Sequence, residues 1–149
     1  IYVLISFIFF LLIDFNDNFY STFNLFIFIV ISFDIFSYLV GKYIGKNQLM
    51  KISPNKTLEG FIGGIFISFI LSLLVSIFLG FNLNLNLILF ISLVIIFAFI
   101  GDIIESFYKR KNNLKNSSEF IPGHGGVFDR FDSFLFAIIF YSISIHNLL

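Results

Sequence analysis

The stretch GFIGGIFISFILSLLVSIFLGFNLNLNLILFISLVIIFAFIG, from Gly60 to Gly101, contains no charged residue. A helix needs roughly 20 apolar residues to cross a bilayer core about 30 Å thick. The stretch is long enough for two crossings, and the asparagine-rich segment 82–86, just after Gly80, marks a turn between them. We therefore expect two antiparallel transmembrane helices here, over about 60–81 and 86–104.

The composition of the 149-residue chain excludes a water-soluble domain. Hydrophobic residues make up 58% and charged residues 12% of the chain, and the mean hydropathy is +1.01. Soluble domains are roughly one quarter charged, and a domain of this size has too little interior to hide so much apolar surface. The absence of cysteine excludes disulfides, thiolate metal sites and cysteine nucleophiles. The formal net charge is zero, and we expect no nucleic-acid partner.

Three further apolar stretches flank the central one. They cover about 1–13, 22–40 and 131–147, and polar connections separate them. No internal repeat is visible. We expect an all-α, polytopic transmembrane protein with about five membrane segments, forming a single membrane-embedded domain over residues 1–149.

The positive charges predict how the chain is oriented in the membrane. All nine Lys and Arg residues fall in two polar segments, 42–56 and 109–130, and the turns at 14–18 and 82–86 contain none. Loops rich in Lys and Arg stay in the cytoplasm. Counting the spans gives the same orientation. Two spans separate the basic segments, so the chain crosses the membrane and returns, and both segments fall on one side. We expect both in the cytoplasm.

Five acidic residues lie within or at the border of apolar segments, where charge is costly and is a sign of function. They are Asp34, Asp102, Glu105, Asp129 and Asp132. The spacing of three puts Asp102 and Glu105 on one helical face, and the same holds for Asp129 and Asp132. Carboxylates beside Lys and Arg suit a divalent metal with a polyphosphate. The alternative is that these charges mark the interface or pair with nearby lysines.

Glycine and proline interrupt the two basic segments. A glycine-rich turn at 123–126 surrounds His124 and lets the backbone approach a ligand, although an ordinary turn has the same composition. Pro54 breaks any helix in the first basic segment, and Thr57 is placed to cap the next one. Close helix packing explains two GxxxG spacings at least as well as ligand binding does. These are Gly41 with Gly45, and Gly60 with Gly64.

The two basic segments together resemble the phosphatidate cytidylyltransferases, the CDP-diacylglycerol synthases. The hallmark pattern comprises SFYKR (106–110), then Lys115, then IPGHGGVFDRFD (121–132). SPNKTLEG (53–60) is similar to the Ser-Pro-x-Lys-Thr-x-Glu-Gly segment of that family. The resemblance runs in order over about 34–133. It departs from the family pattern after Lys115, where Asn116 stands in place of the usual Asp.

The resemblance implies transfer of a cytidylyl group from CTP to phosphatidate, giving CDP-diacylglycerol and pyrophosphate in phospholipid biosynthesis. It implies Mg²⁺ as cofactor, with a second cation left open, and it suggests a homodimer in a lipid membrane. Members of the family are about twice as long. We therefore expect the C-terminal, catalytic part of a longer protein of the inner (cytoplasmic) membrane, with its active site facing the cytoplasm.

The resemblance also assigns roles to residues. Asp102 and Asp129 are the expected metal ligands, and Asp132, Lys109 and Arg130 complete the catalytic set, with Glu105 in support. The expected substrate-binding residues come from the same motifs. They are Asp34, Ser53, Asn55, Lys56, Thr57, Arg110, Lys115, His124, Gly125 and Gly126.

Three other interpretations remain open at this point. A CTP-dependent enzyme of the membrane can act on another lipid, a polyprenol or an archaeal-type lipid. A transporter or channel half would use Asp34, Asp102 and Asp129 as a cation pathway. An inactive fragment that only packs against partners is the third. The transporter interpretation does not explain why the cations gather beside the acids on one side only.

Overall fold

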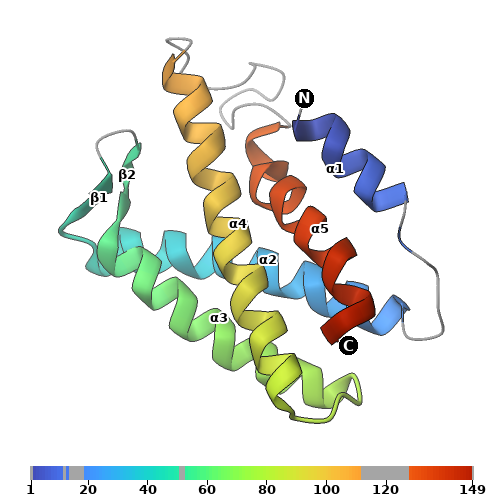
Figure 1. The fold of residues 1–149 in the computed structure, drawn as a ribbon. Helices are drawn as coiled ribbons and strands as arrows, with labels where there is room; N and C mark the ends of the chain where they lie inside the picture. The colour runs from blue at the N-terminus through green and yellow to red at the C-terminus, as the bar shows by residue number, and fades with distance from the viewer. Residues whose placement is uncertain (1, 12, 14–18, 51–52, 112–127, 149) are drawn as a thin grey trace.

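In the part of the chain that the structure describes, the protein is a bundle of five helices with one small hairpin (Figure 1). The computed structural model describes residues 2–11, 13, 19–50, 53–111 and 128–148. Helix α2 packs most extensively against α3, α4 packs against α5, and α1 lies beside α5. In chain order the elements are α1 (Tyr2–Leu11), α2 (Phe19–Ile44), β1 (Gln48–Met50), β2 (Ser53–Thr57), α3 (Leu58–Phe78), α4 (Leu85–Lys111) and α5 (Phe128–Leu148).

The all-α, multi-pass class is confirmed, and each of the five expected segments coincides with a helix. The number of membrane spans was somewhat overstated. Among the described residues, three helices are long and apolar enough to cross a membrane, namely α2, α3 and α4. Helix α1 has only ten residues, and the apolar part found in α5, Ser133–Ser144, is also short. The chain is a multi-pass membrane protein.

Helices α2 and α4 extend beyond the predicted ends at 40 and 104. Their last turns carry basic residues, Lys42 in α2 and Lys109 to Lys111 in α4. Cations in a last turn stabilise a helix by interacting with its negative C-terminal end, so the helices continue past the apolar stretch. Asp34 consequently lies well inside α2, about 15 Å before its end at 1.5 Å per residue.

The predicted turn between the two central helices is confirmed. Helix α3 ends at Phe78, and Gly80 adopts a φ of +85°, which is favourable only for glycine at a helix end. The side-chain oxygen Oδ1 of Asn84 accepts a hydrogen bond of 2.8 Å from the backbone N–H of Leu87 and so caps α4. The asparagine-rich segment therefore reverses the chain and starts the next helix.

Helices α2 and α3 approach closely because glycines line their contact. A Cβ atom added at Gly64 would lie 2.6 Å from the Cβ of Ser37, and one added at Gly60 would lie 2.8 Å from the Cα of Gly41. Contacts this short leave no room for a side chain. The structure therefore gives both GxxxG spacings a packing role, as expected for membrane helices.

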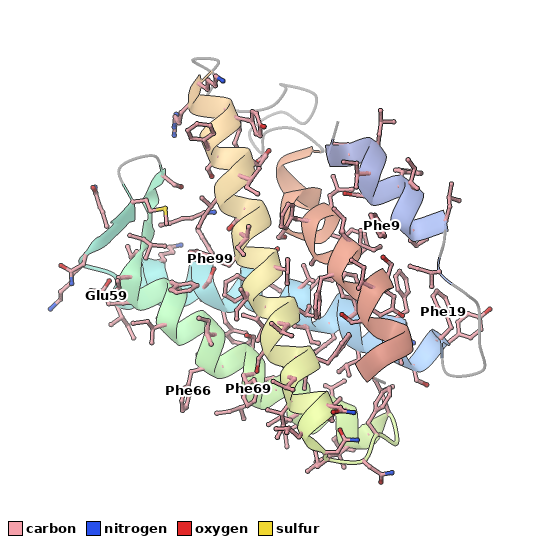
Figure 2. The ribbon with its side chains drawn as sticks, in the orientation of Figure 1. Phe9, Phe19, Glu59, Phe66, Phe69 and Phe99 are labelled. Atoms are coloured by element: carbon pink, nitrogen blue, oxygen red, sulfur yellow. The ribbon has the colours of Figure 1, made fainter. Side chains whose placement is uncertain are left out.

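Aromatic side chains fill the space between α2, α4 and α5. Phe26, Phe90 and Tyr141 are fully buried, and the Tyr141 hydroxyl lies 3.0 Å from Oγ1 of Thr22 in a hydrogen bond between α5 and α2. Phe99 points into the bundle, where it stacks on the ring of Phe61, whereas Phe66 points away from it (Figure 2).

Candidate active site

A short antiparallel hairpin, β1 and β2, connects α2 to α3. Gln48 pairs with Thr57 and Met50 with Ser53. The sequence predicted only a polar connection here, because strands this short carry no alternation of polar and apolar residues. The predicted cap is confirmed: Oγ1 of Thr57 accepts a hydrogen bond of 3.1 Å from the backbone N–H of Gly60. The hairpin and the cap together fix the backbone on either side of Lys56.

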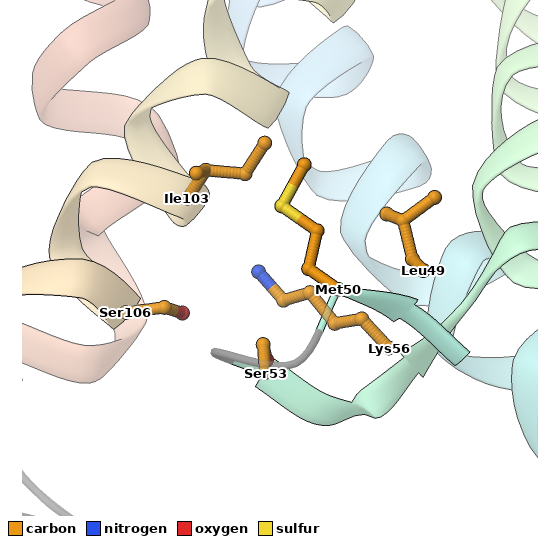
Figure 3. Close-up of a pocket in the computed structure, with 6 residues that line it drawn as sticks. All are labelled: Leu49, Met50, Ser53, Lys56, Ile103 and Ser106. Carbon is orange, nitrogen blue, oxygen red and sulfur yellow. The ribbon is translucent and has the colours of Figure 1, made fainter. Parts of the chain in front are cut away.

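Lys56 of the hairpin forms an ion pair with Asp102 of α4. Both side chains are partly shielded from solvent, with exposed fractions of 28% and 23%. Figure 3 shows the Lys56 side chain extending from β2 toward α4, where its amine faces Ser106. The space left between hairpin and helix here is about 10 Å³, roughly the room for one water molecule. The Lys56 side chain therefore bridges the hairpin and α4.

A cavity of about 700 Å³ opens beside this ion pair. Its volume falls within the range of roughly 300–1,000 Å³ that is usual for small-molecule sites. Part of its wall is apolar and comes from α2, α3 and α4, with Phe61 and Phe99 among the lining residues. The predicted site residues on its wall are Asp34, Ser53, Lys56, Thr57 and Asp102. The cavity thus combines opposite charges and hydroxyls with an apolar surface.

Asp34 links the cavity to the start of α5. The hydroxyl of Ser133 donates a hydrogen bond of 2.7 Å to Oδ2 of Asp34. Ser133 lies near the N-terminal end of α5, so this bond ties that part of the helix to the cavity wall. The sequence analysis missed Ser133, and its only signal is that it directly follows the motif ending at Asp132.

A second ion pair lies further along α4. Nζ of Lys109 is 2.6 Å from Oε2 of Glu105, one turn away on the same helix. The Glu105 side chain is only 7% exposed, so the lysine balances a nearly buried charge. Neither residue is on the wall of the 700 Å³ cavity. The sequence left open that the acidic residues simply pair with nearby lysines. Asp102 and Glu105 both do so, with Lys56 and Lys109.

The remaining predicted site residues are described only in part or not at all. Arg110 is in the last turn of α4. Asp129, Arg130 and Asp132 belong to the first turns of α5, and their side chains are outside the described part, as is that of Asn55 in β2. Four further predicted residues lie outside the described residues altogether. They are Lys115, His124, Gly125 and Gly126.

The described acids fit a metal site that substrate completes. Among the residues that the structure describes, no three or more His, Asp or Glu side chains gather closely enough to hold a metal by themselves. Two carboxylates, Asp34 and Asp102, nevertheless face one cavity. Mg²⁺ at sites that act on polyphosphates is commonly held by one or two carboxylates together with phosphate oxygens. The donor set on the cavity wall is of this kind.

Fold and site together define a helical membrane protein with a partly charged, partly apolar cavity. The chain belongs to the cytidylyltransferase family, whose model matches residues 1–148.

Two bacterial relatives illustrate the similarity. The phosphatidate cytidylyltransferase of Staphylococcus aureus (strain COL) is 45% identical over 107 residues, which are 70% of this chain and 41% of the relative. That of Bacillus subtilis (strain 168) is 41% identical over 143 residues, 94% of this chain and 53% of the relative. The chain thus spans about half the length of these relatives or less.

Proposed function

We propose that the protein containing this chain transfers a cytidylyl group from CTP to phosphatidate, forming CDP-diacylglycerol and pyrophosphate. One observation carries the proposal: Lys56 of the first basic segment and Asp102 of α4 meet at a cavity that is charged on one part of its wall and apolar on another. CTP is highly charged and phosphatidate is an amphiphile, so their reaction needs both surfaces. The names of the relatives support the same reaction.

The chemistry of this reaction requires no protein nucleophile. A phosphate oxygen of phosphatidate forms a bond to the α-phosphorus of CTP. The bond from that phosphorus to the oxygen bridging to the β-phosphate breaks, and pyrophosphate leaves. Catalysis of this kind depends on positioning and on neutralising phosphate charge. The lysines on the cavity wall, Lys42 and Lys56, are suited to the second task.

Each part of the cavity wall has a task in this proposal. The amine of Lys56 binds phosphate oxygens, and Ser53 and Thr57 offer hydroxyls on the same wall. The apolar residues of α2, α3 and α4 accept the start of the acyl chains. Arg110, Lys115 and Arg130 add positive charge for the triphosphate, and the turn at 123–126 shapes the nucleotide site.

We propose Mg²⁺ as the cofactor, held by Asp102 and Asp129 with Asp132 in support. Bound there, Mg²⁺ would neutralise phosphate oxygens. Asp102 contributes a carboxylate at the cavity, and Lys56 orients that carboxylate in the ion pair. Lys109 acts indirectly by balancing Glu105 on the same helix. A second cation and a homodimer are extensions of this proposal.

The active site is proposed to face the cytoplasm from the inner membrane. The charge distribution supports this, because the first basic segment contributes Lys42 and Lys56 to the cavity wall and loops rich in Lys and Arg stay in the cytoplasm. CTP is a soluble cytoplasmic nucleotide, while phosphatidate stays in the leaflet. A site at that interface reaches both.

The proposal is tested with the full-length protein in liposomes that contain phosphatidate, supplied with labelled CTP and Mg²⁺. Labelled CDP-diacylglycerol is the expected product, and it should be absent without metal. Parallel liposomes contain a polyprenol or an archaeal-type lipid instead. Product with either of these and none with phosphatidate would show that the acceptor is wrong. Failure with every acceptor would contradict the proposed reaction itself.

A further inference from the structure

We infer that Glu59 is a positioning residue for Lys56: its carboxylate fastens the base of the hairpin and so sets where the lysine amine lies at the cavity. The inference rests on the proposed function, because Lys56 is the residue through which Glu59 acts. Glu59 belongs to the motif SPNKTLEG (53–60), yet it is not on the wall of the cavity. Its contacts explain what it does there.

The Glu59 carboxylate accepts hydrogen bonds from two consecutive residues, Lys46 and Asn47. The backbone N–H of Lys46 is 3.1 Å from Oε2, and that of Asn47 is 3.2 Å from both carboxylate oxygens. The Asn47 side-chain amide, Nδ2, donates a third contact of 2.7 Å to Oε1. Figure 2 places Glu59 at the end of α3 that adjoins the hairpin. Hydrogen bonds to an ionised acceptor are about twice as strong as neutral ones.

Lys46 and Asn47 form the connection between the end of α2 and the start of β1. The carbonyl oxygen of Asn47 also accepts a hydrogen bond of 2.9 Å from the backbone N–H of Leu58. The connection is thus held to the start of α3 by the Glu59 side chain and by the backbone bond from Leu58 to Asn47. We call these contacts of Glu59 and Leu58 with Lys46 and Asn47 the clamp, and Glu59 supplies its side-chain part.

The clamp determines the position of Lys56 because the hairpin cannot do so alone. An isolated two-stranded hairpin is marginally stable at best. Among its described residues, this one pairs Gln48 with Thr57 and Met50 with Ser53, with an irregularity between the pairs. Lys56 directly precedes Thr57, and its amine must cross from β2 to Asp102 on α4. A shift at the base of the hairpin therefore displaces the amine and weakens its contact with the phosphate oxygens of CTP, which raises the KM.

A purely local role for Glu59 makes a different prediction. An acidic residue in the first turn of a helix is stabilising through the helix dipole, wherever else it points. Asp would serve that role as well as Glu, but its side chain is one methylene shorter and cannot span to Lys46 and Asn47. Gln loses the charge but keeps the length and one acceptor oxygen. Comparing Asp with Gln therefore separates the clamp from the dipole.

The test measures kcat and the KM for CTP with the full-length protein in phosphatidate liposomes. The variants are Glu59→Asp, Glu59→Gln, Glu59→Ala and Lys56→Ala, together with the double variant Lys56→Ala/Glu59→Ala. We expect Glu59→Asp and Glu59→Ala to raise the KM roughly tenfold with little change in kcat, in the manner of Lys56→Ala. Glu59→Gln should recover part of the loss. In the Lys56→Ala background, Glu59→Ala should change the KM less than twofold, because both act at one point.

Other outcomes would overturn the inference. A lower kcat at unchanged KM would indicate only a smaller folded fraction, and Asp equal to wild type would indicate the dipole role. Independent, additive effects of Lys56→Ala and Glu59→Ala would show that Glu59 does not act through the lysine. If Lys56→Ala leaves the KM unchanged while wild type is active, the role proposed for Lys56 fails, and the positioning role fails with it.

A second measurement does not depend on activity. Hydrogen exchange of the backbone amides of the hairpin should be faster in Glu59→Asp than in Glu59→Gln, while the amides in the middle of α3 stay protected. If the wild-type protein makes no product with any lipid, the proposed function fails. The exchange pattern alone then tests whether Glu59 holds the base of the hairpin in place. Equal exchange in all variants would overturn it.

Discussion

Lys56 and Asp102 together account for most of the chemistry proposed here. A carboxylate this close to the membrane interior is costly unless a cation balances it, and Lys56 does so from the hairpin between α2 and α3. Removing one partner leaves the other partly buried without its counter-charge. The ion pair therefore both positions the two side chains at the cavity and stabilises the fold around them.

Lys56→Ala should raise the KM for CTP at least tenfold, because the phosphate oxygens lose a cation and the hairpin loses its contact with α4. Lys46→Ala is the matched control. Its side chain is exposed, and the substitution keeps the backbone N–H that Glu59 binds. Steady-state kinetics in phosphatidate liposomes measure both. An equal KM change in the two variants would point to a general loss of positive charge instead of a specific contact.

Ser133→Ala should lower the stability of the bundle by about 1–3 kcal/mol, because the Asp34 carboxylate loses a hydrogen-bond donor. The thermal unfolding midpoint in detergent micelles measures the effect. Ser144→Ala removes a hydroxyl that donates to the Phe140 carbonyl within the same helix, and it serves as the control. The midpoint should fall clearly further for Ser133→Ala. Equal shifts would mean that the bond to Asp34 contributes nothing special.

Sequence alone predicts part of the site at this scale. Charge inside apolar segments identifies Asp34 and Asp102, and the motif SPNKTLEG (53–60) identifies Ser53 and Lys56. The hydrogen-bond partner of Asp34 could not be predicted in this way. Ser133 lies 99 positions away, and a single serine belongs to no recognisable sequence pattern. Only the packing of α5 against the rest of the bundle reveals it.

At the scale of whole elements, the helices are predictable and the hairpin is not. Long apolar stretches must become helices, because an unpaired backbone is too costly inside a bilayer. Helix ends are harder to predict, since the basic last turns of α2 and α4 continue beyond the apolar residues. The strands β1 and β2 have three and five residues, and they depend on contacts with α3 and α4 that the local sequence does not contain.

Gly64→Ala should destabilise the contact between α2 and α3 by about 1–3 kcal/mol, because the new Cβ would meet the backbone and Cβ of Ser37. Gly63→Ala is the control, since the three atoms nearest its Cβ would all belong to the Val40 side chain and none to the backbone. Thermal unfolding in detergent compares the two. A larger loss for Gly63→Ala would contradict the packing described for these helices.

For the molecule as a whole, the account predicts which loops share a side of the membrane. A single cysteine replacing Lys46 or Lys111 in a cysteine-free full-length protein should react with an impermeant reagent only from the cytoplasmic side. Leu83→Cys, in the turn between α3 and α4, should react only from the opposite side. The measurement uses intact cells and inverted membrane vesicles. Labelling of positions 46 and 111 from opposite sides would exclude a shared site.

The central claim is that the cavity beside the Lys56–Asp102 ion pair is where cytidylyl transfer takes place, and one comparison tests it most directly. Full-length wild type, Asp102→Asn and the control Lys46→Ala are incubated with labelled CTP, phosphatidate liposomes and Mg²⁺, and CDP-diacylglycerol is measured. Asn keeps the size of Asp102 and removes only its charge. We predict metal-dependent product from wild type and Lys46→Ala, and a loss of at least 100-fold in Asp102→Asn while the protein still inserts and folds. Undiminished product from a folded Asp102→Asn variant would contradict the account.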